Sequence, residues 1–157
     1  MDGQVKPRAS DKVVRIGGAS GFWGDSSLGP VQLVRAGGID YLVFDYLAEL
    51  TMSILAGARI KRPEEGYATD FVTVALRSVL KQAVEQRIRI VSNAGGVNPR
   101  GCAAAAQALA DSLGVKVRIA FVEGDDVLPL AFEMRAAGST PAAPSPIAAA
   151  AASGGNW

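Results

Sequence analysis

Apolar residues along the chain fall into short continuous runs and longer periodic stretches. Runs at 12–16, 41–44 and 88–92 are rich in β-branched and aromatic residues and are too short for helices, so each predicts a strand. A fourth run at 115–122 predicts another strand. Helical spacing predicts helices over 46–56 and 70–86, and Asn98 with Pro99 predicts a further helix that ends at Leu113 and Gly114. A short apolar helix is expected to follow, up to about residue 135.

Strands that alternate with helices and have almost continuously apolar centres are typical of a parallel sheet covered on both faces. We therefore predict a small three-layer α/β domain, Rossmann-like, with a mainly parallel sheet of four or five strands. Right-handed crossovers place all the strand-end loops at one edge, which is where ligands bind in such sheets. The candidate site is expected at that edge.

The composition divides the chain into three parts. Residues 1–11 predict a flexible N-terminus, and residues 12–137 carry the α/β pattern. Residues 138–157 are rich in Ala, Pro, Ser and Gly, which predicts a disordered tail or linker. Because four strands make a small sheet for this architecture, we expect the chain to be the front portion of a longer protein.

The residue types present exclude several classes of site. The chain has no histidine and one cysteine, Cys102, which excludes within it a Ser-His-Asp triad, a histidine metal site and an intrachain disulfide. Its net charge of +1 comes without a basic stripe, and no apolar run reaches the roughly 20 residues of a membrane helix. The first residues lack the order of a secretory signal peptide. We expect a cytoplasmic protein that binds neither nucleic acid nor membranes.

A glycine-rich loop at 17–26 follows the first predicted strand. Its glycines allow backbone amides to approach an anion closely. The adjacent rings of Phe22 and Trp23 predict a binding wall or a partner interface, and the alternative is a tight turn with both rings tucked under the core. The candidate ligand-binding residues of this loop are Gly17, Gly18, Ser20, Gly21, Trp23 and Gly24.

Three carboxylates near strand ends are candidates for catalysis. Asp45 and Glu49 lie four residues apart across a strand-to-helix junction, and paired acids can hold a metal or divide acid and base roles. In the alternative, Asp45 caps the helix and Glu49 stays in solvent. Asp25, in the glycine-rich loop, is the third candidate acid or base. No metal site is predicted, because the acids at 123, 125 and 126 are more typical of a polar helix start.

Two further loops carry polar candidates for ligand binding. Tyr67 and Asp70 can present a phenol and a carboxylate to the same edge, although Asp70 is equally a helix cap. Asn93 lies directly at the end of the third strand, where an amide can bind a carbonyl or a phosphate. Gly95 and Asn98 complete that loop, and Asn98 is better interpreted as the cap of the next helix.

Four blocks in order resemble the N-terminal domain of the acyclic terpene utilisation, AtuA-type, family. They are the loop at 19–26, Asp-Tyr-Leu-Val-Phe-Asp-Tyr-Leu-Ala-Glu-Leu-Thr at 40–51, Gly-Tyr-x-x-Asp at 66–70 and Val-Ser-Asn-Ala-Gly-Gly-Val-Asn-Pro-Arg-Gly at 91–101. The resemblance covers roughly residues 12–123. It implies a role in the degradation of citronellol- or geraniol-like terpenes and related branched acyl compounds, with no reaction assigned. Members of the family are usually much longer, and the chain departs from them after about residue 137.

A short-chain dehydrogenase is the rival resemblance. Gly18, Ala19 and Ser20 with Gly24 look like its glycine turn, and the segment 93–95 looks like its Asn-Ala-Gly element. The glycine spacing is wrong for that fingerprint, however, and no Tyr-x-x-x-Lys occurs in the chain. The catalytic pair of that family is therefore missing.

Three hypotheses for function follow. The first is an enzyme, or part of one, that acts on branched acyl or terpenoid compounds, with no cofactor assigned and a CoA thioester as one candidate substrate. The second is a non-catalytic assembly or accessory domain for acyl-CoA-processing enzymes, and the third and least favoured is a nicotinamide-dependent dehydrogenase. The expected partners are a small acyl or terpenoid ligand, and either a second copy of the chain or an acyl-CoA-processing enzyme.

Overall fold

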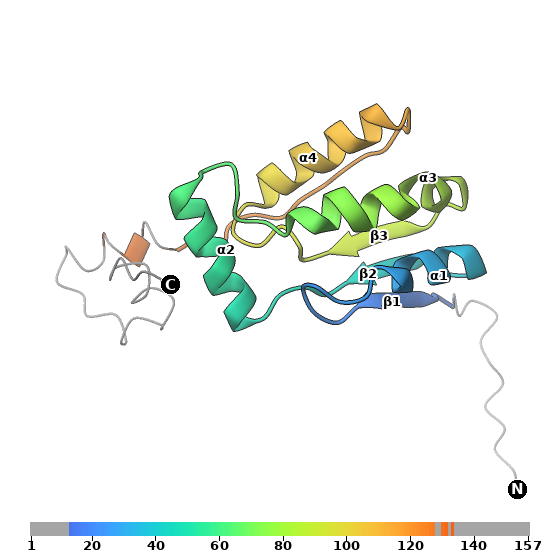
Figure 1. Cartoon of the computed structure of the whole chain (residues 1–157), viewed down its shortest axis with the longest axis horizontal. Helices are drawn as coiled ribbons and strands as arrows, with labels where there is room; N and C mark the ends of the chain where they lie inside the picture. Colours follow the sequence, from blue (N-terminus) through green and yellow to red (C-terminus); the bar gives the residue numbers. More distant parts are fainter. Residues whose placement is uncertain (1–12, 128–129, 132, 134–157) are drawn as a thin grey trace, which may run out of the picture.

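The computed structural model describes residues 13–127, 130–131 and 133, which form an α/β fold (Figure 1). A π-helical segment, η1, runs directly into α3. The elements in chain order are β1 (Ile16–Ser20), α1 (Leu28–Ala36), β2 (Tyr41–Phe44), α2 (Glu49–Lys61), η1 (Phe71–Leu76), α3 (Arg77–Glu85), β3 (Arg89–Ser92) and α4 (Pro99–Ser112).

The sheet of the described residues has three parallel strands in the order β1-β2-β3. Tyr41 of β2 pairs with Ile16 on one side and with Arg89 on the other. Phe44 likewise pairs with Ser20 and Ser92, after an irregularity in β1 between Gly18 and Ser20. The carboxyl ends of the three strands therefore meet at one edge of the sheet, and α2 lies across that end of the molecule (Figure 1).

Within the part of the chain that the structure describes, one face of the sheet is covered by helices and the other is open. Leu42 and Phe44 are almost fully buried beneath the helices, whereas Ile16 is 65% exposed and Val91 is 51% exposed on the opposite face. The reason is topological: strands added in one direction by right-handed crossovers place every connecting helix on the same side. The prediction of three layers with four or five strands is therefore wrong for this part of the chain, which has two layers and three strands.

The core lies between the sheet and the helices α1, α3 and α4. Phe44 and Phe71 meet edge to face with ring centroids 5.2 Å apart, and Tyr46 packs against both rings. The helix predicted over 70–86 is found as η1 and α3, and the apolar residues at its helical spacing are all buried: Val72, Ala75, Leu76, Val79 and Ala83. The predicted cap of α4 is also confirmed, because the side chain of Asn98 accepts a hydrogen bond from the amide of Gly101 at 3.0 Å.

Several predicted boundaries are wrong. The first strand is displaced from 12–16 to Ile16–Ser20, because the glycines beyond Ile16 pair with β2 and belong to the strand. The second helix is displaced from 46–56 to Glu49–Lys61, which leaves Tyr46 outside it. Helix α1 was not predicted; it buries Pro30 and Val34 and ends at Gly37, whose φ of 68° suits glycine.

The run at 115–122 forms no strand. After α4 the chain turns back along α4 (Figure 1) and does not pair with β3. It is held instead by Arg100 of α4, whose guanidinium lies 5.2 Å from the ring centre of Phe121 and 2.6 Å from a carboxylate oxygen of Glu123. Of the short helix predicted up to residue 135, residues 130, 131 and 133 are helical, residue 127 is not, and the other positions lie outside the described residues. No helix within the described ranges is long and apolar enough to cross a membrane.

Candidate functional site

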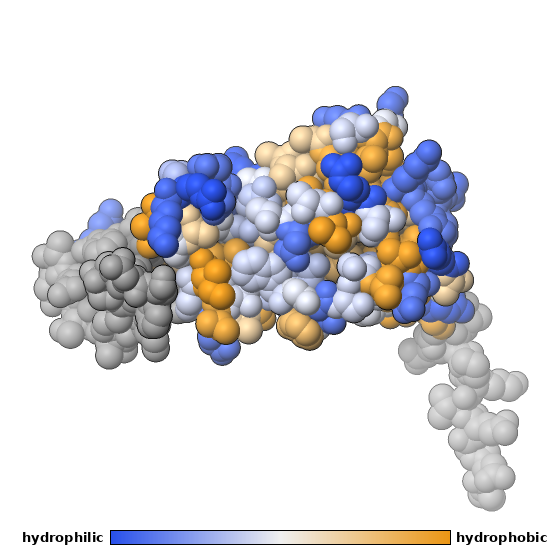
Figure 2. Space-filling view, viewed as in Figure 1, coloured by the Kyte–Doolittle hydropathy of each residue, from blue (hydrophilic) through white to orange (hydrophobic). Residues whose placement is uncertain are grey.

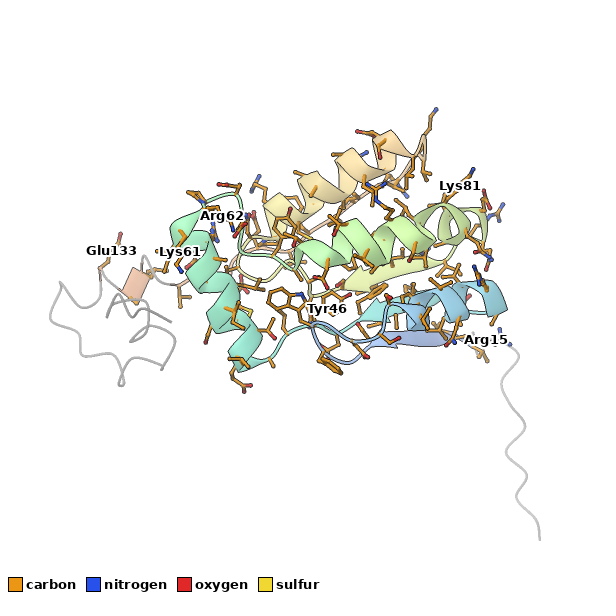
Figure 3. All side chains as sticks on the ribbon, viewed as in Figure 1. Arg15, Tyr46, Lys61, Arg62, Lys81 and Glu133 are labelled. Carbon is orange, nitrogen blue, oxygen red and sulfur yellow. The ribbon has the colours of Figure 1, made fainter. Side chains whose placement is uncertain are left out.

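A small cavity of about 30 Å³ opens at the carboxyl edge of the sheet. Its wall joins the first strand-end loop, the end of β2 and the start of η1, which are far apart in the sequence. Figure 3 labels Tyr46 at this edge and Arg15 at the opposite, amino edge. The lining residues are Ala19, Ser20, Asp25, Ser26, Ser27, Pro30, Phe44, Tyr46, Asp70, Val74 and Ala75.

Ser20 contributes a buried polar group that lacks a partner. Its Oγ has no hydrogen bond within the part of the chain that the structure describes. A buried hydroxyl without a partner costs about 1–3 kcal/mol, so a water molecule or a ligand group is expected to satisfy it. Ser20 is the last residue of β1 and lines the cavity, so its unpartnered hydroxyl is available to a group bound there.

Tyr46 provides a neutral phenol at the same cavity. The residue is only 6% exposed, and burial is the main cause that raises the pKa of its hydroxyl, with the negative charges of Asp70 and Asp25 adding to it. The Ser20 hydroxyl lies near enough to lower that pKa in part, although the two groups do not meet the geometry of a hydrogen bond. The phenol therefore stays protonated near neutral pH and can donate to a ligand.

Asp25 closes the glycine-rich loop with its own side chain. Its carboxylate accepts hydrogen bonds from the amide of Gly21 at 2.9 Å and from the amide of Ser26 at 2.6 Å. These two bonds hold the pKa of the carboxyl group below its usual value. Asp25 is thus an ionised acceptor, which suits a base or a binding group and not a general acid. It also occupies two of the amides that the glycine pattern offers to an anion.

Trp23 and Phe22, adjacent in the sequence, have different surroundings. The indole Nε1 of Trp23 donates to Asp70 Oδ1 at 2.6 Å, and the ring packs against the core. Phe22 is 60% exposed. Asp70 stands at the N-cap position of η1 without capping it, since its carboxylate binds the indole instead. The ring of Trp23 is therefore packed against the core, as in the tight-turn alternative, whereas the ring of Phe22 is exposed to solvent.

Asn93 ties the ends of β2 and β3 together. Its Oδ1 accepts from the amide of Tyr46 at 2.7 Å, and its Nδ2 donates to Asp45 Oδ1 at 2.7 Å. Asp45 is thereby oriented by an amide, and no hydrogen bond or ion pair joins it to Glu49 within the described residues. Glu49 begins α2 and is exposed. Asp45 is thus held by the amide of Asn93, whereas Glu49 lies at the surface.

Two of the candidate glycines, Gly17 and Gly95, lie where a side chain would contact neighbouring residues closely. A side chain at Gly17 would meet Ile39 and Leu33 at 3.1 and 3.2 Å, so this glycine admits the packing of those residues on the sheet. Gly95 is similarly close to Pro99, with 2.9 Å left for a side-chain carbon. Both glycines therefore serve close packing in the fold.

The remaining candidates also lie away from the cavity lining. Gly18 is on the open face of the sheet, and Gly24 has a φ of 93° with open space around it. Asn98 donates to the carbonyl of Glu65 at 2.8 Å besides capping α4, and burial raises the pKa of the Tyr67 phenol, which packs against the core.

The structure adds Tyr46 to the set of functional candidates. The sequence pattern places Tyr46 inside the helix predicted over 46–56, and a residue within a helix is not a candidate for a site at the end of a strand. Its place directly after Asp45 at the end of an apolar strand is the signal that marks it. Within the described ranges no group of three or more Cys, Asp or Glu residues could hold a metal ion, and Glu123 is paired with Arg100.

Comparison with known proteins gives one family. Residues 14–153 match the family described as acyclic terpene utilisation family protein AtuA. The matched region contains all the residues that line the cavity. No curated protein and no solved structure matches the chain.

Proposed function

The chain belongs to the acyclic terpene utilisation family AtuA, and from this premise we propose that it is an enzyme, or part of one, in the catabolism of citronellol- or geraniol-type compounds. In this proposal the cavity at the carboxyl edge of the sheet holds the polar end of the compound. The observation that carries it is the unpartnered Ser20 hydroxyl, which faces a cavity that also holds a protonated phenol and two carboxylates.

The groups around the cavity suit a neutral oxygen function. A hydroxyl can donate to the carboxylate of Asp25 or Asp70 and accept from the phenol of Tyr46. A carbonyl oxygen can accept from Tyr46 and Ser20. With a volume of about 30 Å³, the cavity has room for a group the size of a water molecule. It would therefore hold a terminal oxygen and leave the branched carbon chain outside.

Exposed apolar residues at the same end of the molecule offer a surface for that carbon chain. Leu50 is 73% exposed and Ile54 is 50% exposed on one side of α2, where Figure 2 shows hydrophobic residues at the surface. Phe22 adds an exposed ring in the loop after β1. Burial of such groups against a hydrocarbon gains about 25 cal/mol per Å² of apolar surface removed from water. The proposed ligand therefore has an apolar body and one polar end.

The charges at the site disfavour an anionic end. Asp25 is held ionised, and its carboxylate already occupies the amides of Gly21 and Ser26. A phosphate would have to displace that carboxylate and would face Asp70 as well. A CoA thioester would consequently place its phosphates away from this loop, and an alcohol or aldehyde fits the cavity better than a carboxylic acid.

Ligand-induced stabilisation of the purified full chain tests this proposal. Geraniol and citronellol should raise the melting temperature, by an amount equivalent to about 2.7 kcal/mol at 100 times the dissociation constant, whereas geranic acid and free CoA should have little effect. The variant Ser20→Val, which fills the site without a hydroxyl, should lose the effect. Asp111→Asn on α4 is the control and should keep it, because among the described residues the carboxylate of Asp111 bonds to Gln107 of its own helix and not to the cavity. Equal shifts for Ser20→Val and the unaltered chain would refute the site, and no shift with any terpenoid would refute the function.

A further inference from the structure

The open face of the sheet is a feature that the proposed site does not use. Alternation along the strands sends every second side chain to this face. It consists of Ile16 and Gly18 of β1, Tyr41 and Val43 of β2, and Arg89 and Val91 of β3. Parallel sheets are normally covered by helices on both faces, whereas no helix of the described residues covers this apolar surface.

A groove of about 180 Å³ borders the open face at the amino ends of the strands. Arg89 lies in it with its guanidinium carbon 5.5 Å from the centre of the Tyr41 ring, and donates to the Tyr41 hydroxyl at 2.7 Å. The hydroxyl and the ring thus fix the direction of this cation. The groove is lined by Val14, Asp40, Tyr41, Arg87 and Arg89.

Arg87 stands in an unusual backbone conformation beside Arg89. Its φ of 59° is the left-handed value that glycine normally provides just after a helix, here after α3. An arginine at such a position costs about 1 kcal/mol relative to glycine, which points to a use for the side chain.

The groove carries a net positive charge, because two arginines face the single carboxylate of Asp40. Neither Arg87 nor Arg89 forms an ion pair among the described residues. The one carboxylate of the groove, that of Asp40, already accepts from the amide of Arg15 at 2.8 Å. Two cations therefore border an apolar surface that begins at Val14, which is 47% exposed, and continues to Ile16 and Val91.

We propose that the open face binds an amphipathic α-helix of a partner protein, with acidic side chains of that helix at Arg87 and Arg89. The apolar stripe of the helix would cover Ile16, Val43 and Val91. In α/β proteins helices pack antiparallel to the strands, so the end of the helix that reaches the groove is its C-terminal end, whose carbonyl groups carry partial negative charge. Both the side chains and the backbone of the partner then complement the two arginines.

The size of the surface favours one helix over a second copy of the chain. Strands of four to five residues at about 3.3 Å per residue, three of them about 4.8 Å apart, span roughly 16 Å by 14 Å. A helix of about eleven residues is 16 Å long, and its width of about 10 Å matches the other dimension. The resulting area, about 220 Å², is far below the roughly 800 Å² per partner of a stable interface between two folded proteins.

Two synthetic peptides test the proposal with the full chain. Both are 14-residue amphipathic helices with the same leucine stripe; one ends in two glutamates and the other in two lysines. We expect the acid-ended peptide to bind at least about tenfold more tightly at low salt, with the difference shrinking as salt is raised. Fluorescence anisotropy with a labelled peptide measures both constants. Equal affinities, or no binding of either peptide, would overturn the proposal.

Three variants locate the binding surface. Val91→Lys places a charge on the open face and should abolish binding. Arg87→Gly removes one cation at a position where glycine is favoured, so this variant should fold at least as well as the parent and should bind the acid-ended peptide at least threefold more weakly. Arg77→Ala, an exposed cation at the start of α3, is the control and should bind like the parent. A concentration-dependent dimer in sedimentation that Val91→Lys abolishes would assign the face to a second copy and would overturn the partner-helix proposal.

Discussion

The indole Nε1 of Trp23 donates a 2.6 Å hydrogen bond to Asp70 Oδ1 across 47 residues of sequence. This bond joins the loop after β1 to the start of η1, and both segments line the candidate cavity. The shape of the cavity therefore depends on a contact between two elements that do not pair in the sheet.

Removal of this bond should destabilise the fold and loosen the site together. Trp23→Phe keeps an aromatic ring but leaves the Asp70 carboxylate without the indole, and hydrogen bonds to charged groups contribute about 1.5–3 kcal/mol. We expect the free energy of unfolding in urea to fall by about that amount. Phe22→Leu, at the exposed neighbour, should change it by less than about 0.5 kcal/mol. Similar losses in the two variants would contradict the role given to the indole.

Asn93 offers a test that separates its two hydrogen bonds. Asn93→Asp keeps an oxygen that can accept from the Tyr46 amide, but it places a second carboxylate where Asp45 accepts the amide of Asn93. Repulsion between the two carboxylates should lower the melting temperature at pH 7. The loss should shrink below about pH 4, where carboxyl groups become protonated.

Asn93→Ala serves as the comparison for that prediction. It removes both bonds without adding a charge, so its loss of stability should be nearly independent of pH. If both variants showed the same pH dependence, Asn93 would not be the link between Asp45 and the end of β2.

The local parts of this fold could be predicted from the sequence, and its sheet could not. The apolar face of the helix from Val72 to Ala83 and the Asn98 cap follow from spacing and side-chain chemistry within one element. The run at 115–122 has the composition of a strand, yet Arg100 holds it through Phe121 and Glu123 without a ladder to β3. Strand formation depends on a partner, and one strand's sequence does not contain that information.

The candidate site was predictable only in part for the same reason. Ser20 and Asp25 are marked by their place after a strand in a glycine-rich loop. Their meeting with Tyr46 and Asp70 requires the order of the strands and the true start of α2, which lie beyond local periodicity. The sequence also does not show that the carboxylate of Asp25 accepts hydrogen bonds from the amides of Gly21 and Ser26 in its own loop, because these bonds depend on how the loop folds.

Gly96 should tolerate no side chain. It has a φ of 51°, and a side-chain carbon there would lie 2.5 Å from Leu55 Cδ1 and 2.7 Å from the carbonyl oxygen of Gly66. The second contact is with backbone, which cannot move aside easily. Gly96→Ala should cost at least about 3 kcal/mol by strain and overpacking, measured by urea unfolding.

Gly114 is the matched control for that substitution. Its φ is 66°, but nothing lies within 4 Å of the added carbon. Gly114→Ala should therefore show only the cost of a left-handed backbone, about 1 kcal/mol. Equal losses at the two positions would mean that the contact with Leu55 and Gly66 is not as close as the structure shows.

Asp25 should contribute to the loss of stability at acid pH. The pKa of its carboxyl group lies below the ordinary value of 3.8 in the folded chain, because the amides of Gly21 and Ser26 bind the ionised form. A lowered folded pKa contributes stability that is present above about pH 4 and is lost as the pH falls through the folded value. The melting temperature of Asp25→Asn should therefore lie below that of the parent at pH 6 and approach it near pH 3. A gap that stays constant from pH 6 to pH 3 would assign the loss to packing alone.

Cys102 should be unreactive until the chain unfolds. It is buried in α4, and burial raises the pKa of its thiol from 9.0 to about 11, so about one molecule in a thousand carries the thiolate at pH 8. A folded pKa above the unfolded one also means that this group's contribution to stability is complete below about pH 9 and disappears as the pH rises through about 11.

Labelling of Cys102 with a disulfide reagent at pH 8 should then follow the rate of unfolding, and added urea should accelerate it. A thiol introduced by Ala104→Cys, at an exposed position of the same helix, should react within seconds in the folded chain. Equally fast labelling of Cys102 would show that the packing of α4 against η1 opens without global unfolding.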